Sequence, residues 1–160
     1  MRKRTQGREL ALQLLYQADV RGPEPAPPDP GEYLSEQTED AEIQAFAREL
    51  FAGVLERRDE LDGRIRSVAA NWDLARMAVV DRNVLRLAVF ELTLREETPA
   101  AVVINEAIEL AKKFGGKESG GFVNGILDKV RERVAREPKQ IPPAAAPPAA
   151  PPAASPTESE

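Results

Sequence analysis

The chain has 160 residues, of which 42% are hydrophobic but only 5% aromatic, and its net charge is −5. It contains neither cysteine nor histidine, which excludes disulfides, catalytic thiols, Cys/His zinc sites and acid–base catalysis by histidine. Length and composition predict one domain with an aliphatic core, and the lack of a signal peptide or a membrane-spanning apolar run predicts a cytoplasmic protein.

Helical spacing of apolar residues marks the first part of the chain. Leucines and alanines recur every three or four residues over about 5–20, which predicts a first helix. The segment 21–32 contains five prolines and is predicted to be a stiff, extended connection. Thr38 is the expected N-cap of a second helix, whose apolar positions run from Ile43 to Leu55.

The middle of the chain contains the element with the strongest apolar pattern. A third, shorter helix is predicted over 61–68, and 71–77 should be a turn or short helix anchored by Trp72. The segment 81–95 carries apolar residues around most of the helical axis. A helix of this kind is buried by its neighbours, so we expect it at the centre of the fold.

Two further helices are expected before the chain changes composition. Thr98 as N-cap, followed by Pro99, predicts the start of a helix that ends at Gly115. The last helix should run over about 118–135. Beyond it, 138–160 is rich in Pro and Ala and has too few large apolar residues to offset the entropy of ordering, so a disordered tail is predicted.

These elements together predict the fold class. No strand-like alternation and no repeat of fixed period is present in the sequence. We therefore expect an all-α protein, a compact single-domain bundle of about six to seven helices over residues 1–137.

Positive charge gathers at the start of the chain. Arg2, Lys3, Arg4 and Arg8 place four cations in the first eight residues, although the whole chain is acidic. The net charge disfavours a protein that coats nucleic acid, but a local cluster of this kind is an electrostatic footprint for RNA. The alternative is a solvated terminus without a ligand.

A second group of cations lies between the last two predicted helices. Residues 115–119 lack the preceding strand and the spacing of a phosphate-binding loop, so a helix-ending turn is the better interpretation. The turn still gathers Lys112, Lys113 and Lys117 beside the N-terminus of the last helix. Backbone N–H groups at such an end could meet an RNA phosphate.

Phe122 lies at the edge of the apolar face of the last helix, on the side that carries Lys129 and Arg133. One interpretation is an ordinary core phenylalanine. The other is a half-exposed ring beside cations, against which an unpaired RNA base could stack.

Charged residues on the central helix do not form a catalytic group. Glu91 falls between apolar residues, and a pair with Arg95 one turn later is expected. Arg82, Arg86 and Arg95 are expected to form a solvated stripe on or near this helix. No histidine, second carboxylate or pocket motif accompanies Glu91, so the sequence predicts neither an enzyme nor a cofactor nor a metal site.

Four segments carry a resemblance to a known family. They are GRELALQLLYQ near the start, VLRLAVFEL at 84–92, INEAIELAKKFG at 104–115 and FVNGILDKV at 122–130. With them, the chain resembles the NusB family of bacterial transcription antitermination factors. The resemblance implies an all-helical domain that binds boxA RNA together with the small-subunit ribosomal protein also called NusE. It also implies a role in processive transcription of ribosomal RNA operons, with other antitermination factors and RNA polymerase as indirect partners.

The resemblance extends to single positions. The cationic start and Phe122 match family RNA contacts, Glu118 matches an acidic position close to the RNA, and Gln6 is neutral where the family often has arginine. Tyr16 and Asp81 match positions that face NusE. With Lys117 and Lys129 from the charge pattern, the predicted RNA-binding residues are Arg2, Lys3, Arg4, Arg8, Lys117, Glu118, Phe122 and Lys129.

Two alternatives remain open at this stage. One is a helical protein-interaction adaptor without RNA binding. The other is a stand-alone relative of the RNA-binding domain of ribosomal RNA cytosine methyltransferases, although the chain has no cysteine for that catalysis. The sequence also leaves open whether the protein is a monomer or a homodimer.

Overall fold

The computed structural model describes residues 2–22, 29–69, 71–95 and 97–137. These residues form seven α-helices, one short 3-10 helix and no strand, which confirms the predicted all-α class. The elements are α1 (Arg2–Arg21), α2 (Pro30–Gln37), α3 (Ala41–Glu56), α4 (Arg58–Val68), η1 (Leu74–Arg76), α5 (Val79–Leu94), α6 (Ala100–Phe114) and α7 (Ser119–Ala135). The predicted tail and residues 23–28 of the Pro-rich connection lie outside the described residues.

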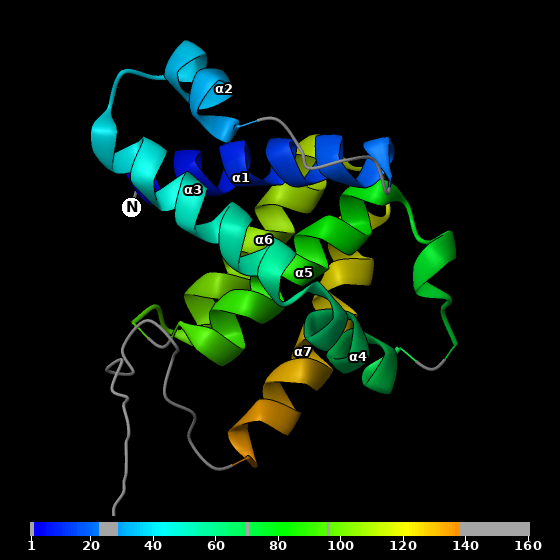
Figure 1. Cartoon of the computed structure of the whole chain (residues 1–160). Coiled ribbons are helices and arrows are strands. Elements are labelled where there is room, and N and C mark those ends of the chain that lie inside the picture. Colours follow the sequence, from blue (N-terminus) through cyan, green and yellow to red (C-terminus); the bar gives the residue numbers. More distant parts are fainter. Residues whose placement is uncertain (1, 23–28, 70, 96, 138–160) are drawn as a thin grey trace, which may run out of the picture.

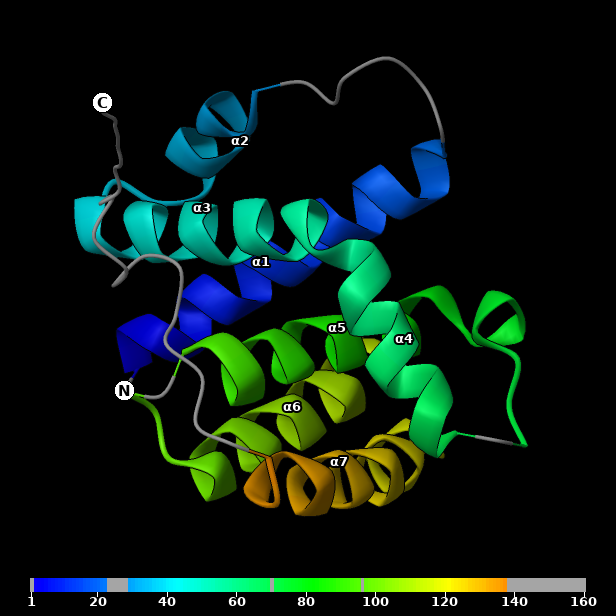
Figure 2. The same ribbon diagram turned by 60° about the horizontal axis from the view of Figure 1, so that its bottom comes forward.

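The helix α5 is the centre of the bundle, as its apolar pattern predicts. It contacts α1, α3, α4, α6 and α7. Figure 2 shows α1 and α3 on one side of α5, with α6 and α7 on the other. Eleven of the 16 residues of α5 are buried, so both sides of the helix contribute to one continuous aliphatic core.

Close helix crossings depend on two glycines. The helix α3 crosses α1 where Phe46 lies against Gly7, and a Cβ at Gly7 would come within 2.6 Å of the phenyl ring. It also passes α5 where a Cβ on Gly53 would overlap the ring of Phe90. Each glycine lets a helix backbone approach an aromatic ring, which fixes how α3 lies across the α1 and α5 pair (Figure 1).

The helix α2 begins inside the Pro-rich segment, where the sequence predicts an extended connection. The carboxylate of Asp29 accepts a hydrogen bond from the backbone N–H of Gly31, and Pro30 occupies the first helical position. Thr38 ends α2 and does not cap α3. The N-cap of α3 is Asp40, whose side chain accepts from the backbone N–H groups of the first turn. The predicted N-cap, Thr38, is therefore wrong by two residues.

Other boundaries agree more closely with prediction. The last helix begins at Ser119 and ends at Ala135, as predicted. The helix α6 begins one residue later than expected, with Pro99 and not Thr98 at the cap position. Trp72 does not anchor its segment, because its side chain is 58% exposed. Leu74 in η1 and the adjacent Met77 are buried instead.

Candidate RNA-binding and partner surfaces

The first turns of α1 present three exposed cations, Arg2, Lys3 and Arg4. The Nζ of Lys3 lies 2.6 Å from Glu42 Oε1 and 3.1 Å from Asp40 Oδ2. Hydrogen bonds to Glu42 and Asp40 raise the pKa of the Lys3 ammonium, so this cation stays charged but is shared with the start of α3. The guanidinium of Arg4 lies 4.6 Å from the centre of the Phe46 ring, in a cation–π contact.

Arg8 does not belong to the exposed cluster. Its side chain is only 1% exposed, and its Nε and Nη2 donate to the two carboxylate oxygens of Glu91 at 2.8 and 2.9 Å. Arg8 also reaches Glu106 at 3.5 Å. The predicted pair between Glu91 and Arg95 is therefore wrong, because Glu91 faces α1 and not the next turn of its own helix. Arg95 bonds the carboxylates of Glu49 and Glu97.

The corner between α6 and α7 presents Lys117 and Glu118 at the surface. The buried hydroxyl of Ser119 accepts a hydrogen bond from the backbone N–H of Gly116 at 2.9 Å and closes the turn. Lys113, at the end of α6, bonds Glu9 of α1 at 3.0 Å. Glu9 lies six residues, or roughly 9 Å of helix, after Lys3. The bond from Lys113 therefore holds this corner against α1, the helix that carries the exposed cations.

Phe122 is half-buried in α7, with one part of its ring packed against the core. The rings of Phe122 and Trp72 meet edge to face, with their centres 4.9 Å apart and an interplanar angle of 76°. The sequence does not predict the partnership with Trp72, because residues in a connection have no periodicity that shows where they point. Lys129, two turns after Phe122 on α7, lines the groove beside this pair.

Tyr16 on α1 and Asp81 on α5 each lie within one helical turn of an ion pair that joins the two helices. Tyr16 is 42% exposed on α1, and Val20, one turn later, is 61% exposed. Asp81 is in the first turn of α5, and its Oδ1 is buried without a hydrogen-bond donor among the described residues. The ion pair between Asp19 and Arg82, at 2.7 Å, holds this part of α1 against the start of α5. Val20 is not among the predicted site residues, although its spacing from Tyr16 could have indicated it.

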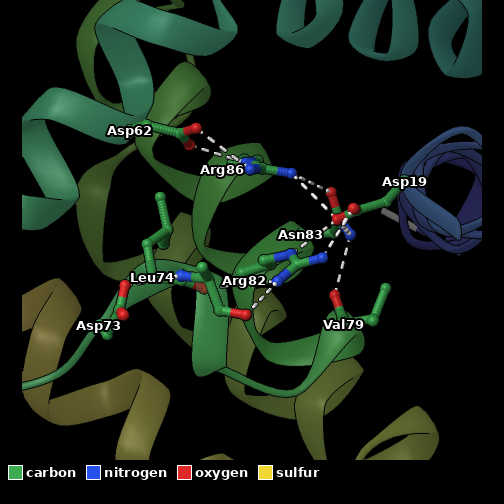
Figure 3. Close-up of polar contacts among 9 residues, drawn as sticks. Asp19, Asp62, Asp73, Leu74, Val79, Arg82, Asn83 and Arg86 are labelled. Carbon is green, nitrogen blue, oxygen red and sulfur yellow. Dashed lines mark hydrogen bonds and ion pairs between the residues drawn. The ribbon is translucent and has the colours of Figure 1, made fainter. Parts of the chain in front are cut away.

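A largely buried polar network joins α1, α4 and α5 (Figure 3). The carboxylate of Asp19 accepts hydrogen bonds from Arg82, Asn83 and Arg86. Arg86 also donates from Nε and Nη2 to the carboxylate of Asp62, at 2.7 and 3.1 Å. The prediction of a solvated stripe for Arg82 and Arg86 is wrong, because both guanidiniums point between helices.

The network changes the acidity of Asp19. Burial raises the pKa of this carboxyl, but hydrogen bonds from Arg82 and Asn83 and the charges of Arg82 and Arg86 outweigh it and lower the pKa to about 2. Asp19 is therefore ionised at neutral pH. The network is a structural clamp between helices.

Two observations bear on other classes of function. Within the described ranges, no three His, Cys, Asp or Glu side chains gather where they could hold a metal ion. In the same part of the chain, none of the helices has the length and apolarity needed to span a membrane.

Comparison with known sequences shows the same family over most of the chain. The model of the NusB family matches residues 5–132. The chain is 52% identical over 127 residues to the transcription antitermination protein NusB of Anaeromyxobacter dehalogenans, covering 79% of this chain and 89% of that relative. It is 52% identical over 125 residues to the protein of the same name from Heliobacterium modesticaldum. That match covers 78% of this chain but only 60% of the length of that relative.

Solved structures share the arrangement of helices. The structure of T. maritima NusB superposes with a TM-score of 0.71 at 38% identity, over 81% of this chain and 90% of that one. A chain from a crystal structure of the antitermination factors NusB and NusE in complex with double-stranded RNA also gives a TM-score of 0.71. It is 28% identical and covers 83% of this chain and 98% of that one. Because sequence and fold agree over this extent, the chain belongs to the NusB family.

Proposed function

We propose that the protein binds boxA RNA together with NusE in the cytoplasm and so supports processive transcription of ribosomal RNA operons. Other antitermination factors and RNA polymerase are then indirect partners. The observation that carries the proposal is the bond from Lys113 to Glu9, which holds the lysine corner between α6 and α7 against α1, the helix that carries the exposed cations. The relatives named as antitermination proteins, and the likeness to a chain in the complex of NusB, NusE and RNA, support it.

When RNA binds at this surface, its phosphate replaces a protein carboxylate as the partner of a lysine. Lys3 already contacts Asp40 and Glu42, so an RNA phosphate that reaches Lys3 takes the place of a carboxylate. Asp40 remains satisfied after the exchange, because it caps α3. Arg8, paired with Glu91, takes no part in phosphate binding and instead holds the helix that presents the other cations.

The first prediction tests the cationic surface. Replacing Arg2, Lys3 and Arg4 together with Ala should weaken boxA RNA binding, because fewer counterions are released. The slope of log K against log salt should fall by about 0.7 for each phosphate that is no longer neutralised. Stability should change little, since all three side chains are exposed. Fluorescence anisotropy of labelled RNA at several salt concentrations measures both the affinity and the slope.

A matched control removes the same charge elsewhere. Arg58, Arg66 and Arg131 are also exposed, and their triple Ala variant should keep the salt slope of the parent. Equal losses of affinity in the two variants would mean that only net charge matters. Unchanged binding by the α1 variant would contradict an RNA contact at this terminus, and absence of binding with and without NusE would favour a protein-interaction adaptor.

The second prediction concerns the partner surface. Tyr16→Ala should weaken binding of purified NusE by about 30-fold or more, since a central tyrosine at an interface carries roughly 2 kcal/mol or more. The melting temperature should hardly move, because Tyr16 is 42% exposed. Gln17, the exposed neighbour on the same helix, supplies the control, and Gln17→Ala should bind like the parent. NusE affinity that survives Tyr16→Ala would place the partner elsewhere.

A further inference from the structure

A furrow follows the line along which α4 packs against α7. One end is a groove of about 300 Å³ lined by Trp72 and Phe122. The other end is a groove of about 360 Å³ lined by Arg64 and Glu137. Val68 lines both grooves, so they adjoin. The furrow therefore leads from the end of α7 back along this helix to the aromatic pair.

The aromatic end of the furrow suits an extended, proline-rich segment. Its floor on α7 is helix backbone, because Gly121 and Gly125 carry no side chain. The rings of Trp72 and Phe122 meet edge to face beside this floor, and the indole is 58% exposed. Grooves lined by aromatic rings are the surfaces on which polyproline II segments dock. Asn71 adds a hydrogen-bond donor for a chain whose own carbonyls have no internal partner.

The chain leaves α7 at the opposite end of the furrow. Nη1 and Nη2 of Arg64 in α4 donate to the two carboxylate oxygens of Glu137, each at 3.0 Å. The backbone N–H of Glu137 also donates to the carbonyl of Val134 at 3.1 Å. Glu137 is the last residue that the structure describes. The next segment of the chain therefore starts at the mouth of the furrow.

The residues that follow have the composition of a polyproline II ligand. Residues 138–143 read Pro-Lys-Gln-Ile-Pro-Pro. Ile141 is the only large apolar residue in the segment 138–160. Proline favours the polyproline II conformation before binding, so little entropy is lost when such a segment docks.

The length of this segment matches the length of the furrow. Gly125 lies ten residues, or roughly 15 Å of helix, before the end of α7 at Ala135. Residues 141–143 lie four to six positions after Glu137, or roughly 12–19 Å along a polyproline II chain. A chain that turns back at Glu137 thus brings its isoleucine and two prolines to the ring of Trp72.

We propose that residues 141–143 fold back along α7 and dock in the groove beside Trp72 and Phe122. Only residues 138–140 separate them from the described part of the chain. So short a tether gives an effective concentration on the order of millimolar, and a weak contact is then enough to fill the groove. The docked segment covers Phe122, so any other ligand of this groove has to displace it. The inference goes beyond the proposed function, and its test contains neither RNA nor NusE.

A nitroxide label can report the docked segment, because the chain contains no cysteine of its own. Ala144→Cys in the full chain places a single label next to the proposed contact. The amide NMR signals of Gly121 and Gly125 should then lose most of their intensity through paramagnetic broadening. The signal of Gly7 should keep its intensity, because α1 lies on the other side of α5 from α7 (Figure 2).

Two variants of the labelled protein separate docking from simple tethering. Ile141→Ser removes the apolar side chain and should restore much of the Gly121 signal. Ala149→Ser, a matched change further along the tail, should leave the broadening as it is. Gly125→Leu fills the groove and should act like Ile141→Ser. The fold should tolerate it, since a Cβ at this position meets no atom within 4 Å and leucine is a better helix former than glycine. Equal broadening in all four labelled proteins would overturn the inference.

The single tryptophan of the chain offers a measurement without a label. Acrylamide should quench the fluorescence of Trp72 more strongly in Ile141→Ser than in the parent, because the indole loses its cover. Ala149→Ser should be quenched like the parent. Equal quenching of Ile141→Ser and the parent would contradict docking at this ring.

A mixed sample tests whether the segment reaches a second copy of the chain instead. Isotope-labelled protein without the nitroxide is mixed with nitroxide-labelled protein of natural isotope abundance. The Gly121 signal should then keep its intensity, because the proposed contact forms within one molecule. Broadening in the mixture as strong as in the singly labelled protein would assign the groove to the tail of a second copy and overturn the inference.

Discussion

Replacing Arg8 with Ala is expected to lower the free energy of unfolding by about 3–5 kcal/mol, the usual cost of breaking a buried ion pair. Arg8 is 1% exposed and Glu91 is 2% exposed, and their two hydrogen bonds are 2.8 and 2.9 Å long. Without the guanidinium, the carboxylate of Glu91 would remain in the core with no cation beside it. Urea denaturation of the two proteins measures the difference.

Two variants make the interpretation specific. Arg2→Ala removes the same charge from an exposed position of the same helix and should change stability by less than about 0.5 kcal/mol. The double variant Arg8→Met with Glu91→Leu removes both charges, and it should recover much of the stability because no buried charge is left alone. A cost below about 1 kcal/mol for Arg8→Ala would show that the pair is not buried as described.

Arg86→Ala should have an effect of similar size, about 3–5 kcal/mol, because Arg86 serves two carboxylates. It donates to Asp62 from α4 and to Asp19 from α1, and its side chain is 8% exposed. Truncation leaves Asp62 without its cation and removes one of the hydrogen bonds that hold α1 to α5. Thermal denaturation at neutral pH, with Arg76→Ala as an exposed control, measures the decrease in stability.

The same variant should also alter the response to acid. Asp19 has a pKa lowered to about 2 from 3.8 in the folded protein, so its ionised form contributes about 2 kcal/mol at neutral pH. Because the folded pKa is the lower one, this stability is present above about pH 4 and is lost as pH falls towards 2. Arg86→Ala removes one stabilising charge, so stability should fall less steeply across this interval. A slope equal to that of the parent would contradict the role of Arg86.

The elements that the sequence predicted well are those whose pattern is local. The apolar residues around the axis of α5 required a central helix, and the glycines after Phe114 ended α6 where expected. The helix α2 was hidden because the prolines around Pro30 suggested an extended chain, although Asp29 and Pro30 form a good helix start. The prediction for Trp72 failed because a short connection has no period to show which side faces the core.

The candidate surfaces were harder to predict, because their geometry depends on residues far apart in the chain. The residues next to Arg8 in the sequence do not distinguish it from Arg4. Arg8 is buried and joins two helices because it pairs with Glu91 of α5. The same applies to Arg86, whose partners come from α1 and α4. Residue types indicated which positions carry charge, and tertiary contacts decided which of those charges reach the solvent.

The pairing of Arg8 with Glu91 has a consequence for synthesis of the chain. The two residues are separated by 83 positions, so α1 leaves the ribosome well before the helix that neutralises it. At the usual rates of bacterial translation, roughly 4–17 s pass before Glu91 is made. During this time Arg8 must remain hydrated, and α1 can pack only against α3, which crosses it at Gly7 and Phe46. The contacts that α1 makes with α5 are therefore formed later than its contacts with α3 while the chain is being made.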